Sequence, residues 1–235
     1  NFSKRISNEN IENALEKITL GLRSSNAVSY KIKKIRAYNE VGRAIVSAIN
    51  NGIDSIDKIT ILPRSGFIGG YTKIAPDDDV ISSGLISKKL LLSNIEIALA
   101  GRAAEIVVFG INEITQYAAN NINYSTEIAK EMVTKYGFSI IGPVCLDQNN
   151  NEIFLGNSLL KNKSLIADKT STIIDNQIIQ ISKEALSNAV LKIRNNRSVL
   201  EKIVDVLIDE ETIDGNRFKK LSTKLLKVWL DKKYE

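Results

Sequence analysis

The sequence contains no histidine and a single cysteine among its 235 residues. Without histidine, neither a Ser-His-Asp nor a Cys-His catalytic arrangement can form, and a zinc site that depends on imidazole is excluded. The single cysteine, Cys145, excludes an internal disulfide and any metal site built from several thiolates, and it is consistent with a reducing compartment. These two absences remove several large classes of hydrolase from consideration.

Long apolar runs and concentrated charge are also missing. No stretch reaches the roughly 18 apolar residues of a membrane-spanning helix, and the first residues lack the order of a signal peptide. The chain has 32 basic and 27 acidic residues, a net charge of +5, but the basic residues are spread out and aromatic residues make up only 6%. Nucleic-acid-binding proteins concentrate basic charge and interleave aromatic side chains. We therefore expect no nucleic-acid partner, and no membrane contact by this fragment itself.

What remains is an ordinary globular composition, with 43% hydrophobic and 25% charged residues. Apolar residues recur every three or four positions over most of the chain, which is the period of amphipathic helices. Residues 58–62 and 70–74 instead have the β-rich pattern of a hairpin around a glycine-containing loop. The sequence predicts a mainly α fold, a helical bundle with a small β-hairpin or sheet. The predicted helices cover residues 8–20, 31–50, 85–108 (with Ser82 and Ser83 as caps), 120–136, 170–195, 198–208 and 212–230, and residues 140–154 are predicted to be irregular or weakly β.

The segment Asn39-Glu40-Val41-Gly42-Arg43 is the candidate for chemistry. Zinc peptidases of the H-E-x-x-H type place two imidazoles four residues apart on one helix face, and the intervening glutamate acts as the general base. Here Asn39 and Arg43 occupy the two imidazole positions, and only Glu40 is the residue that the pattern requires. Glu40 and Arg43 are three residues apart on one face, which favours an ion pair between them.

A series of further motifs accompanies this segment. They are Ala37-Tyr38, Lys58-Ile59-Thr60-Ile61-Leu62-Pro63-Arg64, Gly101-Arg102-Ala103-Ala104-Glu105, Val108-Phe109-Gly110, Thr126 to Thr134, Gly142-Pro143-Val144, Ile153-Phe154-Leu155-Gly156 and Glu211-Thr212-Ile213-Asp214-Gly215. Through them, residues 6–225 resemble the peptidase domain of the FtsH family, the membrane-anchored AAA+ ATP-dependent zinc proteases, and especially its cyanobacterial and plastid branch. The resemblance implies an FtsH-type peptidase-like domain in residues 25–235. It also implies that residues 1–24 are a remnant of the AAA+ lid helix and a linker, with the ATPase outside this chain.

The resemblance also assigns the positions of the family's zinc ligands. The two histidine ligands correspond to Asn39 and Arg43, and the aspartate ligand, from a T-T-G-A-x-N-D segment, corresponds to Asn121 in Thr115–Asn121. Glu40 retains the general-base position. An amide is a poor ligand for zinc, and a guanidinium brings a positive charge to the place of a dication. We therefore expect no metal or other cofactor in this domain and no peptidase activity from Glu40, whereas the family uses zinc here and ATP in its ATPase domain.

Two functions stay open at this point. The first is a catalytically inactive domain, a pseudoprotease, that serves as the structural and oligomerisation base of a membrane-anchored AAA+ subunit in protein quality control or translocation. The alternative is an active ATP-dependent zinc metalloprotease, with a rebuilt site or in a mixed hexamer with active subunits. For both, the resemblance implies a homo- or hetero-hexamer of FtsH-like subunits and unfolded or membrane-protein clients. It further implies a plastid thylakoid membrane, or another organellar or bacterial inner membrane, with an upstream anchor and this domain on the stromal or cytoplasmic side.

Overall fold

The computed structural model describes residues 28–63, 69–75, 78–146 and 168–230, together with residues 10, 11, 14, 15, 17, 18 and 21. The elements are, in chain order, α2 (Tyr30–Asn51), η1 (Ile53–Ser55), β1 (Ile56–Thr60), β2 (Tyr71–Ile74), α3 (Asp78–Ser83), α4 (Lys88–Phe109), η2 (Ile111–Glu113), η3 (Gln116–Ala118), α5 (Ala119–Thr134), α6 (Asp168–Asn195), α7 (Arg197–Glu210), β3 (Thr212–Asp214) and α8 (Gly215–Leu230), where η marks a 3₁₀ turn. The structure is thus mainly helical with one small sheet, as the sequence predicts.

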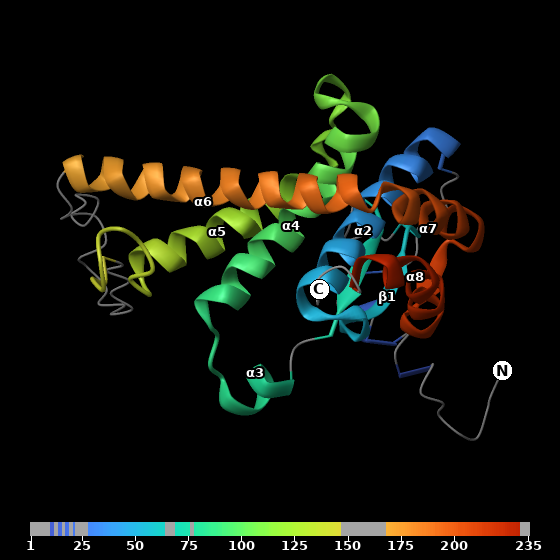
Figure 1. The fold of residues 1–235 in the computed structure, drawn as a ribbon, viewed down its shortest axis with the longest axis horizontal. Coiled ribbons are helices and arrows are strands. Elements are labelled where there is room, and N and C mark those ends of the chain that lie inside the picture. The colour runs from blue at the N-terminus through green and yellow to red at the C-terminus, as the bar shows by residue number, and fades with distance from the viewer. Residues whose placement is uncertain are drawn as a thin grey trace.

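Helix α2 lies at the centre of the fold, between α4, α7 and the sheet (Figure 1). Its apolar residues recur at helical spacing, and the stretch from Ala37 to Ala48 is buried except for Arg43. Asn51 ends the helix because Gly52 takes a φ of 94°, a left-handed conformation that only glycine adopts at little cost. Burial of this helix on several sides places its polar residues, Asn39 and Glu40, inside the protein.

The sheet has three antiparallel strands in the order β2-β1-β3. Ile59 of β1 pairs with Thr72 of β2 on one side and with Ile213 of β3 on the other. The hairpin of β1 and β2 confirms the sequence prediction. The single helix predicted for residues 212–230 is wrong at its start, because residues 212–214 form β3 and the helix begins only at Gly215. The physical reason is pairing with β1, a strand about 150 residues earlier in the chain that no local pattern reveals.

Helices α4, α5 and α6 pack together beside this centre, and α6 runs along both of the others (Figure 1). Their shared apolar cluster includes Leu91 and Ile95 of α4, Met132 of α5 and Ala185 of α6. A larger cluster joins α2 and the sheet to α4, α6 and α7. Helix α4 belongs to both clusters, so it holds the two parts of the core together.

Two further predictions differ from the structure. Helix α4 begins at Lys88, and Ser87 caps it by accepting a hydrogen bond of 3.2 Å from the Leu90 amide, whereas Ser82 and Ser83 belong to the short α3 that the sequence did not predict. The helix predicted over 8–20 lies largely outside the described residues, although those described within it are helical. Residues 147–154 of the predicted irregular segment also lie outside them.

Candidate functional site

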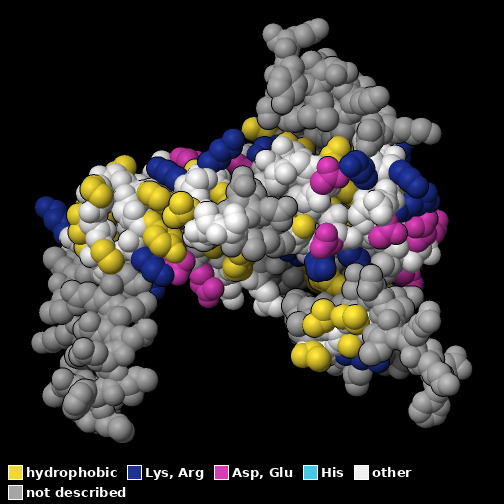
Figure 2. All heavy atoms as spheres, turned by 90° about the horizontal axis from the view of Figure 1, so that it is seen from below, with side chains coloured by type: hydrophobic (Ala, Val, Ile, Leu, Met, Phe, Trp, Pro, Cys, Tyr) yellow, Lys and Arg dark blue, Asp and Glu magenta, His cyan; other side chains and the backbone are white. Residues whose placement is uncertain are grey.

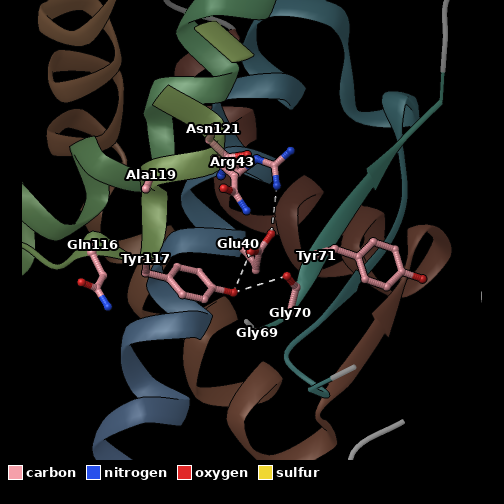
Figure 3. A pocket seen from close by; sticks show the side chains of 10 residues that line it. Glu40, Arg43, Gly69, Gly70, Tyr71, Gln116, Tyr117, Ala119 and Asn121 are labelled. Atoms are coloured by element: carbon pink, nitrogen blue, oxygen red, sulfur yellow. Dashed lines mark hydrogen bonds and ion pairs between the residues drawn. The ribbon is translucent and has the colours of Figure 1, made fainter. Parts of the chain in front are cut away.

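A pocket forms where the middle of α2 meets the start of β2 and the turn before α5 (Figure 3). The residues that line it are Glu40, Arg43, Gly69, Gly70, Tyr71, Gln116, Tyr117, Ala119, Asn120 and Asn121. Three of the four residues that the sequence analysis singled out, Glu40, Arg43 and Asn121, therefore meet here. The fourth, Asn39, is 1% exposed and does not line the pocket.

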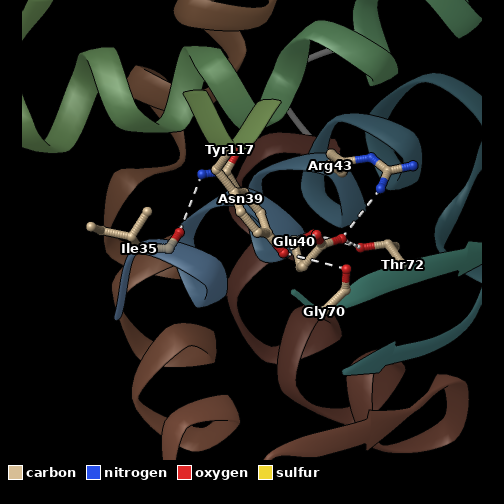
Figure 4. A network of polar contacts seen from close by, with 7 residues as sticks. All are labelled: Ile35, Asn39, Glu40, Arg43, Gly70, Thr72 and Tyr117. Atoms are coloured by element: carbon tan, nitrogen blue, oxygen red, sulfur yellow. Dashed lines mark hydrogen bonds and ion pairs between the residues drawn. The ribbon is translucent and has the colours of Figure 1, made fainter. Parts of the chain in front are cut away.

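The Glu40 carboxylate, buried with 2% of the residue exposed, accepts hydrogen bonds on both oxygens (Figure 4). Its Oε1 accepts one of 3.1 Å from the hydroxyl of Tyr117. Its Oε2 lies 2.7 Å from the hydroxyl of Thr72, which also reaches the backbone carbonyl of Glu40 at 3.0 Å. Because a buried carboxylate is costly without partners, these donors explain how α2 keeps Glu40 inside the protein.

Arg43 completes the surroundings of Glu40. Its Nη1 lies 3.3 Å from Glu40 Oε2, which confirms the ion pair that their spacing predicts. Only one nitrogen takes part, so the contact lacks the two parallel bonds of a bidentate pair. The Nε of Arg43 is buried and has no hydrogen-bond partner among the residues that the structure describes. The pair therefore supplies charge neutralisation more than hydrogen-bond geometry.

Asn39 is turned toward α4. Its Nδ2 donates a hydrogen bond of 2.6 Å to Glu105 Oε1 and a second of 3.2 Å to the Ile35 carbonyl. Its Oδ1 faces Gly101 of α4, where an added Cβ would lie only 2.4 Å away, so the absence of a side chain at Gly101 leaves room for the amide. Figure 4 shows the Asn39 amide directed to the Ile35 carbonyl. The two neighbours on α2, Asn39 and Glu40, thus serve different networks.

Glu105 is fully buried at 0% exposure and connects these networks. Besides Asn39, it accepts hydrogen bonds from the Thr115 backbone amide at 2.5 Å and from the Thr115 hydroxyl at 2.9 Å. The Thr115 hydroxyl in turn accepts from the Tyr117 amide at 3.3 Å and caps η3. Glu105 therefore anchors the short turn that carries Tyr117 over Glu40.

Tyr117 lies between α2 and the start of β2 (Figure 3). Its hydroxyl is 3.1 Å from Glu40 Oε1 and 3.3 Å from the carbonyl oxygen of Gly70. An added Cβ at Gly69 would lie 2.3 Å from the Tyr117 ring, so only glycine allows this close packing. Burial raises the pKa of the Tyr117 hydroxyl far above its usual value, and the negative charge and hydrogen bond of Glu40 raise it further. The hydroxyl is therefore a proton donor to Glu40 throughout the physiological range.

The sequence analysis did not single out Tyr117 or Thr72, and it placed Glu105 in the Gly101–Glu105 motif without a role in this site. For Tyr117 a signal was present, because it occupies the glycine position when Thr115–Asn121 is set against the T-T-G-A-x-N-D segment. Thr72 had no comparable signal, and the motif that contains Glu105 does not indicate its partners. Their roles depend on residues 32 and 66 positions away in the chain.

Comparisons with known proteins show the family of the chain. Residues 26–221 match the family model of peptidase family M41. The chain belongs to this family. It is 35% identical over 216 residues to the ATP-dependent zinc metalloprotease FtsH of Cyanidium caldarium, which covers 92% of this chain and 34% of that protein. It is also 34% identical over 223 residues to the chloroplastic ATP-dependent zinc metalloprotease FTSH 8 of Arabidopsis thaliana, with 95% of this chain and 32% of that protein covered.

This M41 chain spans about a third of the length of the curated relatives that it matches. Within its described residues, no helix is long and apolar enough to span a membrane. Over the same residues, no three His, Cys, Asp or Glu side chains come together in a group that could hold a metal ion. The side chains gathered around Glu40 are instead a hydroxyl, a phenol, a guanidinium and amides.

Proposed function

We propose that this M41 domain is a catalytically inactive, FtsH-like peptidase domain that serves as the structural and oligomerisation base of a larger AAA+ subunit. The observation that carries the proposal is the ion pair of Arg43 with Glu40, 3.3 Å from Nη1 to Oε2. Arg43 stands at the position of the family's second histidine ligand, and Glu40 at the position of its general base. A fixed cation thus neutralises the carboxylate at the place where the family holds a dication.

The residues at the three ligand positions do not fit zinc. Asn39 directs its Nδ2 to Glu105, Arg43 contributes a positive charge, and Asn121 offers only an amide. A His-His-Asp set carries one negative charge, whereas this set carries one positive charge. Structural zinc in small peptides is worth about 10–16 kcal/mol, and that figure depends on thiolate and imidazole ligands that are missing here. Without a Lewis acid, Glu40 alone does not hydrolyse amides at a useful rate.

The role as an oligomerisation base is supported by exposed apolar side chains at one end of the molecule. Figure 2 shows hydrophobic side chains gathered where α6 begins and α5 ends. The exposed large side chains from these segments are Tyr136, Ile140, Val144 and Ile173. Apolar surface that gathers in this way is typical of an interface between proteins. If this surface meets a different surface of the next copy, the head-to-tail contact repeated around a symmetry axis would close a ring.

The remaining parts of the proposal concern the whole protein, and they rest on the relatives. Residues 25–235 would be the peptidase-like domain and residues 1–24 the end of an AAA+ lid helix with its linker. The full-length subunit would form a homo- or hetero-hexamer and act on unfolded or membrane proteins in quality control or translocation. The chloroplastic and cyanobacterial relatives support a plastid thylakoid or related inner membrane, with this domain on the stromal or cytoplasmic side.

Metal content tests the loss of catalysis directly. The purified domain is dialysed against zinc and then against metal-free buffer, and its zinc is measured by elemental analysis beside the peptidase domain of a zinc-binding relative. We expect the relative to retain one zinc per chain and this domain to retain none. One tightly held zinc per chain, together with cleavage of an unfolded substrate, would overturn the proposal in favour of an active protease.

A further inference from the structure

The hydroxyl of Tyr117 occupies the space from which a general base would have to act. Glu40 stands at the position of the family's general base, and such a base works on a water molecule within about 2.6–3.2 Å of its carboxylate. The Tyr117 oxygen is already 3.1 Å from Glu40 Oε1. On the other oxygen, Thr72 lies at 2.7 Å and Arg43 at 3.3 Å. Both oxygens of the carboxylate are therefore engaged by the protein itself.

Tyr117 is also held firmly in this place. Its ring packs against Gly69 so closely that even a methyl group there would clash at 2.3 Å. On the other side, Thr115 ties the turn to the buried Glu105 through two hydrogen bonds, of 2.5 and 2.9 Å. A side chain fixed at both ends does not swing aside for a ligand without loss of these contacts.

We propose that the Tyr117 side chain occupies the former metal site. Tyr117 is then a fourth inactivating change, in addition to those at Asn39, Arg43 and Asn121. The Tyr117 hydroxyl occupies the position of the water that a general base at Glu40 would activate. The Arg43 guanidinium supplies the positive charge that the metal would supply. Restoration of the three ligand positions alone restores only weak zinc binding. This inference rests on the proposed function, because it assumes that the positions of Asn39, Arg43 and Asn121 once held the ligands.

The other surroundings of the site still suit a ligand. Metal-binding histidines usually donate their second ring N–H to a carboxylate, and loss of that partner lowers metal affinity 10–100-fold. Glu105 Oε1 lies 2.6 Å from the Asn39 amide nitrogen, so a histidine at position 39 would find such a carboxylate already in place. The obstacle that remains after the ligands return is therefore Tyr117, which stands where the family's segment has glycine.

The test compares zinc binding by a set of variants of this domain. The base variant carries Asn39→His, Arg43→His and Asn121→Asp, and three further variants add Tyr117→Gly, Tyr117→Phe or Tyr124→Phe to it. Tyr117→Phe keeps the ring and removes only the hydroxyl. Tyr124 is an exposed residue of α5, so its replacement is the matched control. Zinc affinity is measured by titration calorimetry, and circular dichroism and thermal unfolding check that each variant folds.

We expect the base variant and its Tyr124→Phe form to bind zinc weakly and equally. Addition of Tyr117→Gly should raise the affinity at least about tenfold, or about 1.4 kcal/mol in binding free energy, and give one zinc per chain. If Tyr117→Gly prevents folding, the zinc affinity of the Tyr117→Phe form is compared with that of the base variant instead, and it should also be higher. Equal affinity with and without Tyr117 would overturn the inference while leaving the proposed function intact. Zinc binding by the wild-type domain would overturn both.

Discussion

Asn39 donates a hydrogen bond of 2.6 Å to the carboxylate of Glu105, although the two residues are 66 positions apart. Asn39 lies on α2 directly before Glu40, and Glu105 lies on α4. The contact therefore links the two central helices at the level of the pocket. Because Glu105 also binds Thr115, it couples the packing of α2 on α4 to the position of the turn that carries Tyr117.

Replacement of this carboxylate by its amide should destabilise the domain. Glu105→Gln keeps the volume but turns one acceptor oxygen into a donor, which then faces either the Asn39 amide or the Thr115 N–H. Since hydrogen bonds to charged groups contribute about 1.5–3 kcal/mol, we expect a loss of that size in the free energy of unfolding. Urea denaturation measures it. Glu127→Gln, at an exposed position of α5, is the control and should stay within about 0.5 kcal/mol of the wild type. Equal free energies of unfolding for Glu105→Gln and Glu127→Gln would contradict the stabilising role of the Glu105 hydrogen bonds.

Removal of the Arg43 guanidinium should lower the free energy of unfolding more than removal of an exposed guanidinium does. In Arg43→Ala, the buried Glu40 carboxylate loses its only cationic partner among the described residues, although Tyr117 and Thr72 remain. We expect a loss of about 1–3 kcal/mol in unfolding free energy. The comparison is Arg197→Ala, which breaks the exposed Arg197–Glu201 pair and should cost at most about 1 kcal/mol.

A double-mutant cycle separates the charge from the packing of Arg43. If the cost of Arg43→Ala comes from the uncompensated carboxylate, then Glu40→Gln in the same chain should recover part of it, with a coupling energy of about 0.5–3 kcal/mol. Strictly additive effects would show that the ion pair contributes nothing and that Arg43 acts only through its aliphatic part.

The local features of this site could be predicted from the sequence, and its long-range features could not. Helix α2 and the Glu40–Arg43 pair follow from periodicity and from a spacing of three residues. The hydrogen bond from Tyr117 to Glu40 joins residues 77 positions apart. No pattern along the chain encodes which donor a buried carboxylate will find at that separation. The family resemblance marks Thr115–Asn121 as part of the site through the ligand position of Asn121, and it assigns no role to Tyr117.

The contrast between local and long-range features also explains where the predicted elements differ from the observed ones. The strand β3 has only three residues and exists because Thr212 and Ile213 pair with β1. Locally, its sequence adjoins an amphipathic helix and is read as the first turn of that helix. At α4, the cap is Ser87 and not the earlier serines, since those residues end α3. Short elements that owe their existence to a distant partner are the ones that periodicity misses.

The exposed apolar end of the molecule should mediate assembly. At high micromolar concentration, analytical ultracentrifugation of the domain should show species larger than a monomer. Ile140→Asp, at a residue 78% exposed, should shift the population to monomers without a change in thermal stability. Ile111→Asp is the control, because Ile111 is similarly exposed at 69% but lies after α4 in η2. A strictly monomeric wild type would weaken the proposed oligomerisation role. If Ile140→Asp and Ile111→Asp changed the monomer population equally, the interface would not lie specifically at this end of the molecule.

Loss of the Tyr117 hydroxyl should change how stability depends on pH. The folded-state pKa of Tyr117 is raised, first by burial and then by the charge and hydrogen bond of Glu40, whereas the unfolded chain titrates near the usual value of about 10. The folded state therefore holds this proton more tightly. Its stabilising contribution is complete below pH ~10 and is lost as the pH rises above that value, by up to ~1.4 kcal/mol per pH unit.

Tyr117→Phe removes both the hydrogen bond and this pH dependence. At pH 8 the variant should be less stable than the wild type by about 0.5–1.5 kcal/mol, the usual net value of one hydrogen bond. Above pH ~10 the difference should shrink and then reverse, since only the wild type has a phenol at position 117 that ionises in the unfolded chain while the folded state retains its proton. Tyr38 also has a raised pKa, from burial and then from Glu201 and Asp205, but it titrates in both proteins and cancels from the difference. Urea denaturation from pH 8 to 11 measures the two curves, with Tyr124→Phe as the control that should follow the wild type. Parallel curves for the wild type and Tyr117→Phe would show that the folded-state pKa of Tyr117 is not raised.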